Sequence, residues 1–454
     1  MERVVGDWQR GVRTVCYDEA TGVRVREYVQ RNFQFKPQIV HYENVDVEYF
    51  NGAVLSNPCP KDSTYLEEER GNVVPPWAQG GDGGTGRAAY AHRVVRHAAA
   101  ADNRTFVRIK RFDVYNSYEA FHAYLNTFFL LRVLRLDPTS VQFVFTDTRR
   151  GDSPRDEMWW RSMNGGRHPI VFSNNNGQRN VGVVDGVPYR VRSMVTASSS
   201  GTSMLTSKHG ALRGRRRDHH CSSPAFQEAV GWFRENFRVH NNISYSLQRP
   251  RRRMLSSAAA KANTTNSEVV RVLWSSRRPY QRGGVIKAVH RQLPREEDFI
   301  AALQRLLSSM GATATPPSSS ASPLPPRSSS SFVVESIDFG AIDPQVAVEA
   351  ASNADVLVGV HGAGLVWSAF MPRHGGLVEL FGGNRGATNR HYHNLASLAD
   401  LHYRSHTLSA ASATSANTPL GSRRQRSSSS SIGWRGRDVH AVARLILGIP
   451  LYRE

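Results

Sequence analysis

One short run of residues constrains the fold of this chain more than any other. It is the apolar segment from Asp355 to Val360, which continues directly into a turn of His361, Gly362, Ala363 and Gly364. A buried parallel strand that ends in small residues at the start of a helix is typical of α/β proteins. The N–H groups at such a helix start can bind a diphosphate, but a tight turn that only packs well fits the same spacing.

Strand and helix patterns alternate along the rest of the chain. Apolar or β-branched runs predict strands at 141–146, 169–172, 268–274, 331–337, 355–360 and 376–381. Helical spacing of apolar residues predicts helices at 117–135, 226–237, 295–307, 344–352, 391–399 and 437–447, with another helix after the turn at 362–365. The alternation predicts an α/β fold of two Rossmann-like, doubly wound domains that face each other across a cleft.

Low-complexity segments divide the chain into these domains. Five stretches rich in Ser, Ala, Gly, Pro or Arg have too little apolar periodicity to form a core, and they lie at about 79–103, 196–223, 248–267, 308–331 and 409–431. We therefore expect an amino-terminal domain over 1–247, a linker over 248–267, and a second domain over 268–408. A segment over 409–431 then leads to a carboxyl-terminal helix within 432–454.

The net charge of +20 raises the alternative of a basic protein that binds nucleic acid. Much of the excess lies in arginine-rich runs inside the predicted insertions, at 213–217, 249–253 and 423–426. Solvated loops account for such charge without any partner, so we do not expect nucleic acid to be the partner. Deleting these runs separates the two interpretations, because nucleic-acid affinity would then vanish.

The cysteines and the apolar runs say little about the cellular compartment. Three cysteines without a CxxC pair predict neither a disulfide framework nor a zinc site. No apolar stretch reaches the length of about 18 residues that a membrane span needs. The first residues lack the apolar core of a signal peptide, so we expect either a cytosolic protein or an upstream segment.

Polar and charged residues within or just after two predicted strands are candidates for ligand binding. Glu379 lies within an apolar strand, where a carboxylate needs bonded partners and could accept the hydroxyls of a ribose. Ser276 and Arg277 follow the strand that begins at Glu268, and Arg291 lies downstream. A guanidinium at a strand end suits a phosphate. No Asp-x-Asp motif and no HExxH motif occurs, so we expect no metal.

Together these residues resemble glycosyltransferase family 61. The resemblance covers roughly residues 105–405, with insertions, and is strongest at the carboxyl-terminal motifs. These motifs are Ala354–Leu365, Phe370–Pro372 and Glu379–Phe381, preceded by Ser276–Arg277, Arg291 and Glu296–Phe299.

The resemblance implies a GT-B fold and an inverting, metal-independent transfer of GlcNAc or a pentose from a UDP-sugar to a hydroxyl of a protein or glycan. No cofactor is implied besides the donor substrate. Arg277, Arg291 and His361 with the turn at 362–364 would bind the diphosphate, and Glu379 the ribose. The resemblance also implies that the protein works in the lumen of the endoplasmic reticulum or Golgi.

The amino-terminal helix departs from the family pattern. The family commonly has a histidine and then an aspartate there, and the aspartate is a candidate general base. In this chain Glu119 and Ala123 occupy those places, and His122 lies out of register. Because an inverting transfer needs a base, Glu119 and His122 become the candidates. A relative that binds a nucleotide sugar or glycan without turnover is the alternative.

Overall fold

The computed structural model describes residues 12–18, 23–28, 39–48, 53–54, 102–109, 115–145, 154–167, 171–172, 189–196, 223–240, 268–282, 285–287, 291–312, 330–382, 389–409 and 434–451. The chain divides into two compact units. The first comprises Met1–Arg217 and Pro224–Ser244, and the second Asp218–Ser223 and Tyr245–Glu454. Among the described helices, none is long and apolar enough to cross a membrane.

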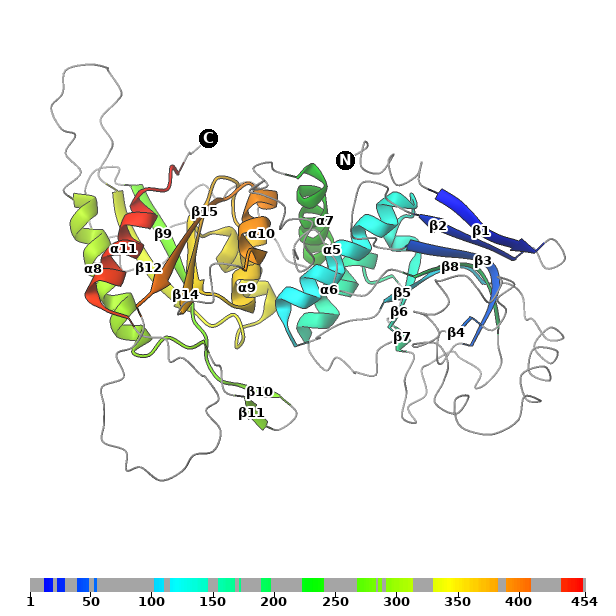
Figure 1. Ribbon diagram of the computed structural model, residues 1–454, viewed down its shortest axis with the longest axis horizontal. Coiled ribbons are helices and arrows are strands. Elements are labelled where there is room, and N and C mark those ends of the chain that lie inside the picture. Colours follow the sequence, from blue (N-terminus) through cyan, green and yellow to red (C-terminus); the bar gives the residue numbers. More distant parts are fainter. Residues whose placement is uncertain are drawn as a thin grey trace, which may run out of the picture. The chain divides into compact units, whose positions relative to one another are not determined.

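The second unit contains a sheet of five parallel strands (Figure 1). Their order is β12 (Ser330–Ile337), β9 (Glu268–Ser275), β13 (Val356–Val360), β14 (Gly376–Gly382) and β15 (His402–Leu408). All four pairings in this sheet are parallel. Within this sheet, β12 lies on one side of β9, and the next strand in sequence, β13, lies on the other. This order places a topological switch point between β9 and β13.

Helices cover both faces of this sheet, as the alternating pattern predicts. On one side lie α8 (Glu296–Ala312) and α11 (Gly436–Leu447), and on the other α9 (Pro344–Ser352), the 3₁₀ helix η2 (Ala363–Phe370) and α10 (His391–Ala399) (Figure 1). A short hairpin of β10 (Tyr280–Arg282) and β11 (Val285–Lys287) follows β9. The predicted helix after the turn is therefore present as a tighter 3₁₀ helix.

Burial on both faces explains the continuous apolar run of β13. Val356, Val358 and Val360 pack in one cluster with α8 and α11. Leu357, on the opposite face, is also fully buried. Asp355 then fixes the start of the strand, because its carboxylate accepts the Arg271 N–H at 2.8 Å. This motif residue therefore supports the sheet at the edge opposite to the glycine-rich turn.

The first unit contains a mixed sheet of eight strands. Four of them, β8 (Tyr189–Thr196), β5 (Asp102–Ile109), β6 (Val141–Phe145) and β7 (Val171–Phe172), are parallel neighbours. The antiparallel remainder consists of β1 (Val12–Asp18), β2 (Val23–Tyr28), β3 (Ile39–Glu48) and β4 (Ala53–Val54). The prediction of an α/β unit is confirmed, but a wholly parallel, doubly wound sheet is wrong for this half. The antiparallel strands alternate polar and apolar residues, which is typical of sheets with one solvated face.

Three described helices of this unit pack around aromatic side chains. They are α5 (Ser117–Val133), α6 (Pro154–Asn164) and α7 (Pro224–His240), with a short 3₁₀ turn, η1 (Pro138–Ser140), before β6. Trp159 is fully buried, 4.7 Å from Phe233 and 5.2 Å from Phe121 between ring centroids. Burying one such aromatic side chain contributes about 1.5–3 kcal/mol to folding. The aromatic cluster therefore joins the three helices.

The predicted low-complexity insertions lie mostly outside the described residues. Three boundaries in two of these insertions need correction: α8 continues to Ala312, β12 begins at Ser330, and β5 begins at Asp102. The apolar face of α8 continues through Leu307 to Met310, which packs against the core, so this helix is longer than predicted.

Candidate functional site

The predicted binding residues that the structure brings together lie at the switch point of the second unit. Ser276 and Arg277 follow β9, and His361 with Gly362 follows the adjacent strand β13. In open α/β sheets, ligands bind outside the carboxyl ends of strands at this position. The topology therefore places these residues where a ligand would bind.

Ser276 holds the start of α8. Its side chain is buried, and its hydroxyl donates to Glu296 Oε2 at 2.5 Å. The indole N–H of Trp274 donates to Glu296 Oε1 at 2.8 Å. Both oxygens of a buried carboxylate are thus satisfied by β9 and the residue after it, as a buried charge requires. Binding of a phosphate by the Ser276 hydroxyl stays a prediction, and it would need this hydrogen bond to break.

Arg277 crosses from the end of β9 to the end of β13. Its NH1 group donates to the backbone carbonyl of His361 at 2.5 Å. A Cβ atom at Gly362 would lie 1.8 Å from that NH1. Glycine is therefore required at position 362 for the guanidinium to take this place. The hydrogen bond fixes a positive charge beside the glycine-rich turn.

The turn itself packs closely on β9. A Cβ atom at Gly364 would lie 2.4 Å from the Ser275 hydroxyl oxygen. Ala363 begins η2, whose first N–H groups lack partners within the helix by the geometry of any helix start. The hydroxyl of Tyr392, from α10, donates to the Gly362 carbonyl at 2.5 Å. The turn is thus held from both β9 and α10.

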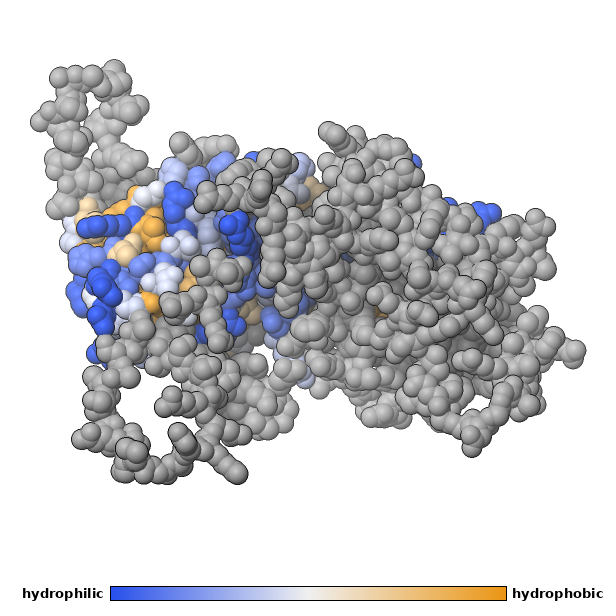
Figure 2. Space-filling model, viewed as in Figure 1, coloured by the Kyte–Doolittle hydropathy of each residue, from blue (hydrophilic) through white to orange (hydrophobic). Residues whose placement is uncertain are grey.

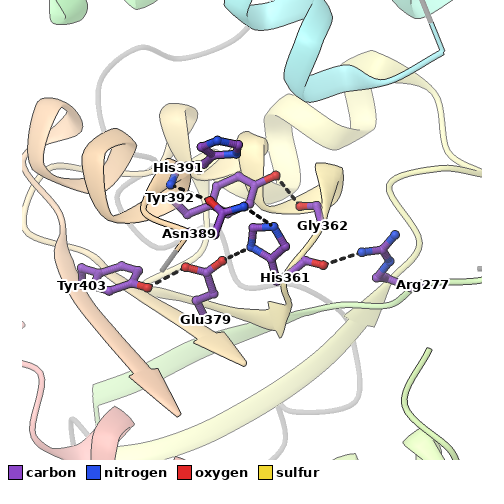
Figure 3. Close-up of polar contacts among 8 residues, drawn as sticks. All are labelled: Arg277, His361, Gly362, Glu379, Asn389, His391, Tyr392 and Tyr403. Atoms are coloured by element: carbon purple, nitrogen blue, oxygen red, sulfur yellow. Dashed lines mark hydrogen bonds and ion pairs between the residues drawn. The ribbon is translucent and has the colours of Figure 1, made fainter. Parts of the chain in front are cut away.

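His361 lies at the centre of a chain of hydrogen bonds (Figure 3). Its Nδ1 bonds to Glu379 Oε1, and the Tyr403 hydroxyl donates to Glu379 Oε2 at 2.6 Å. On the other side of the ring, Asn389 Nδ2 lies 3.1 Å from His361 Nε2. The Asn389 Oδ1 accepts the backbone N–H of His391 at 3.0 Å. Both ring nitrogens of His361 therefore have polar partners.

Aromatic side chains frame the same imidazole. Phe381 stacks on the His361 ring with centroids 5.5 Å apart, and Tyr392 meets it edge-on at 5.4 Å. His391 lies 6.3 Å away, ring centroid to ring centroid. These contacts restrict rotation of the imidazole, so its hydrogen bonds have a defined direction.

Glu379 is fully buried on β14, between β13 and β15. Burial first, and then the negative charge of Glu379 and the hydrogen bond to it, raise the pKa of Tyr403 far above that of a free phenol. Tyr403 therefore stays protonated, and its hydroxyl donates a hydrogen bond to Glu379. Ribose binding by Glu379 stays a prediction, and because the side chain is fully buried, neighbouring groups would have to move to admit the ribose.

Arg291 is not joined to this cluster. It is exposed in the turn before α8, and among the described residues it makes no hydrogen bond or ion pair with the other predicted ligands. Beside this turn lies a hollow of about 630 Å³. Its lining carries both signs of charge, from Arg278, Arg295, Glu296, Glu297 and Asp298.

The two candidate bases lie together in α5 of the first unit. His122 is fully buried, and its Nδ1 lies 3.5 Å from Glu119 Oε2, while the Glu119 side chain keeps 17% of its surface exposed. Ala123, next in sequence, is buried. Of the two candidates, Glu119 can contact a ligand from the surface, and His122 can only support it from within.

Sequence reasoning missed Asn389, Tyr392 and Tyr403. Tyr403 contacts Glu379 from the next strand, 24 residues away, and Asn389 contacts His361 across 28 residues. No local spacing signals such contacts, although Tyr403 falls within a segment that resembles the family. Across the described ranges, no three His, Cys, Asp or Glu side chains converge as a metal site.

The fold and the site define an α/β unit compatible with the Rossmann-like class, with a guanidinium, an imidazole and a glycine-rich turn at its switch point. The sequence model of the family Glycosyltransferase 61 matches residues 232–378. This match, which runs from α7 to β14, supports membership of the chain in glycosyltransferase family 61 and so indicates a glycosyltransferase. The comparison with curated proteins finds none that matches.

Proposed function

We propose that this protein transfers a sugar, GlcNAc or a pentose, from a UDP-sugar to a hydroxyl of a protein or glycan. The transfer inverts the configuration at the anomeric carbon and needs no metal. The observation that carries the proposal is the convergence of Arg277, His361 and the glycine turn at the switch point of a parallel sheet. The family match supports a nucleotide sugar as donor and a separate acceptor.

The proposed chemistry places the diphosphate of the donor at this cluster. The Arg277 guanidinium, the His361 imidazole and the N–H groups at the start of η2 are the donors available for its oxygens. As the bond between the anomeric carbon and the diphosphate breaks, negative charge grows on the departing UDP. Fixed donors stabilise that charge without reorganising, which is usually a large part of catalysis.

The acceptor hydroxyl must lose its proton as its oxygen bonds to the anomeric carbon. We propose that the Glu119 carboxylate takes this proton, because its side chain is partly exposed, and that His122 holds the carboxylate from behind. The proton passes from the acceptor oxygen to Glu119, the new glycosidic bond forms, and UDP leaves.

A non-catalytic relative is the second candidate. Its support is Ala123, a buried methyl group at the place where the family commonly has an acid. Such a protein would bind UDP or a UDP-sugar but would catalyse no transfer and produce no UDP from the donor.

Following the family, we further propose that the protein works in the lumen of the endoplasmic reticulum or Golgi. Cell fractionation tests this location, and a protein found outside the secretory-pathway fractions would contradict it.

The experiment measures UDP release from a panel of UDP-sugars in the presence of EDTA. We compare the wild type with His361→Ala and with His406→Ala as a matched control. His406 also pairs with a carboxylate in the second unit, Asp438 at 3.0 Å, but it lies outside the proposed site. Turnover that survives EDTA and the control but not His361→Ala supports the proposal. UDP binding without turnover supports the non-catalytic relative, and no UDP binding contradicts the nucleotide site.

A further inference from the structure

The hydrogen bonds around His361 define its protonation. The backbone N–H of His391 can only donate, so the Asn389 atom that it contacts is the oxygen. The Asn389 amide nitrogen therefore faces His361 Nε2 and donates to it. Since an acceptor nitrogen carries no proton, the proton of the ring lies on Nδ1, where the Glu379 carboxylate accepts it. In this arrangement (Figure 3) the imidazole is neutral.

A diphosphate needs a different form of the same ring. Its oxygens are acceptors, so Nε2 can bind one only if it carries a proton. Nδ1 cannot give up its own proton without leaving Glu379, a buried carboxylate, short of a donor. The ring must then become an imidazolium with a proton on each nitrogen, and Asn389 must release Nε2.

The groups around His361 favour this change in the presence of a phosphate. Glu379 on β14 supplies the negative charge that an imidazolium needs, and Tyr403 on β15 donates to the same carboxylate. From α10, His391 and Tyr392 face the ring. The positive charge of Arg277, beside the backbone of His361, opposes protonation until an anion lies between them.

We propose that binding of a nucleotide sugar at this site takes up one proton on His361. In this mechanism Glu379 is a positioning residue that holds Nδ1–H, and Asn389 holds Nε2 in its acceptor form until the diphosphate replaces it. The inference rests on the proposed function, since it concerns the same diphosphate.

Coupling to a proton makes affinity depend on pH in one direction. Where the imidazole already carries both protons before the ligand arrives, binding takes up no proton. As pH rises through the range in which histidines titrate, each binding event must bring a proton, and affinity falls by at most about tenfold per pH unit. A site that binds only through Arg277 and the turn would show no such slope.

The test is isothermal titration calorimetry of the wild type with UDP-GlcNAc and with UDP-xylose. The diphosphate of a nucleotide sugar is esterified at both ends, so it carries no group that titrates near neutral pH. Titrations at about pH 8 in buffers of different ionisation enthalpy give the number of protons exchanged, and we expect about one taken up per ligand. At about pH 6 the number should be smaller.

Three variants separate the proton from general damage to the fold. His361→Gln offers an amide donor that needs no proton, so binding should persist with a proton count near zero. Asn389→Asp gives Nε2 an acceptor, so His361 is protonated in advance, and the proton count should again fall while affinity decreases. His406→Gln removes another histidine that pairs with a carboxylate in the same unit, and it should leave the count unchanged.

The outcomes distinguish this inference from the proposed function. If the wild type binds with proton uptake and His361→Gln binds without it, both the proton coupling and the proposed function are supported. Binding of the wild type without uptake at about pH 8 overturns the proton coupling and leaves the nucleotide site standing. No binding of either nucleotide sugar overturns the proposed donor site, and the inference falls with it. A variant that fails to fold leaves the wild-type proton count as the deciding measurement.

Discussion

The two sheets of this protein are built differently. In the second unit all five strands run in parallel, and the predicted ligands Ser276, Arg277, His361 and Glu379 lie on or directly after three adjacent strands. In the first unit a parallel part is extended by antiparallel strands, and the two candidate bases lie on a helix. The contrast teaches that in the second unit the sheet itself aligns the charged groups. In the first unit, packing among the aromatic side chains of the helices places the candidate bases.

The largest expected effect tests this dependence on aromatic packing. Trp159→Ala removes a fully buried indole that contacts Phe121 and Phe233, and should decrease the free energy of unfolding by about 3–5 kcal/mol. Urea denaturation followed by far-UV circular dichroism measures the change. A loss below about 1 kcal/mol would mean that the aromatic cluster does not stabilise the first unit.

The second prediction separates the roles of the two units. Arg277→Ala removes a fixed cation and should decrease kcat by about 10²–10³-fold together with donor affinity. Glu119→Gln should decrease transfer by about 10²–10⁴-fold, while donor affinity stays within about twofold of wild type. Steady-state kinetics with donor titrations measure both. Full activity of Glu119→Gln would remove that residue from the mechanism.

A pH effect should single out the junction between the two parts of the first sheet. His41 on β3 bonds to the Ser193 hydroxyl on β8 at 2.8 Å, where the antiparallel extension joins the parallel part. Burial lowers the pKa of His41 to about 4, against an opposing effect of Glu43 and with a small contribution from Arg26.

The direction of this pH dependence follows from the lowered pKa. The folded state binds the proton less readily than the unfolded state, so stability is complete above about pH 6.5 and decreases as pH falls toward about 4. The loss should reach roughly 1–3 kcal/mol. Denaturation curves of wild type and His41→Gln across this range measure it, and the variant should have a flatter profile. Parallel profiles would exclude His41 as the cause.

The smallest effects compare one glycine from each unit. Gly362→Ala forces Arg277 aside and should weaken donor binding by about tenfold. Gly231→Ala, in the middle of α7 with nothing within 4 Å of the new methyl group, should instead stabilise the protein by about 0.5–1 kcal/mol. Isothermal titration calorimetry measures the change in donor binding, and thermal denaturation measures the change in stability. Unchanged binding by Gly362→Ala would show that Arg277 is not part of the donor site.

The same contrast explains what the sequence could predict. Strands β9, β12, β13 and β14 are compact apolar runs next to helices of regular period, so their positions follow from local pattern. Strands β1 to β3 alternate polar and apolar residues, and α6 is short and rich in polar residues apart from its two tryptophans and two methionines. Neither pattern stands out without its tertiary neighbours, because burial that stabilises these elements comes from distant parts of the chain.

The candidate site follows the same rule. The sequence motif located His361, Arg277 and Glu379, since each lies on or directly after a recognisable strand. It could not predict that both oxygens of Glu379 are used within the protein, because Tyr403 arrives from the next strand of the sheet. Nor could it predict Asn389, whose amide meets His361 across a segment without regular spacing.

The position of α11 has a consequence for biosynthesis. This helix covers the same face of the sheet as α8, through Val439, Val442, Ala443 and Ile446. Until residues 436–447 have left the ribosome, α8 alone covers this face, and the apolar side chains that pack against α11 remain uncovered. Domains generally fold as units during synthesis. The second unit must therefore complete its folding after α11 has been translated, when the first unit is already available to fold.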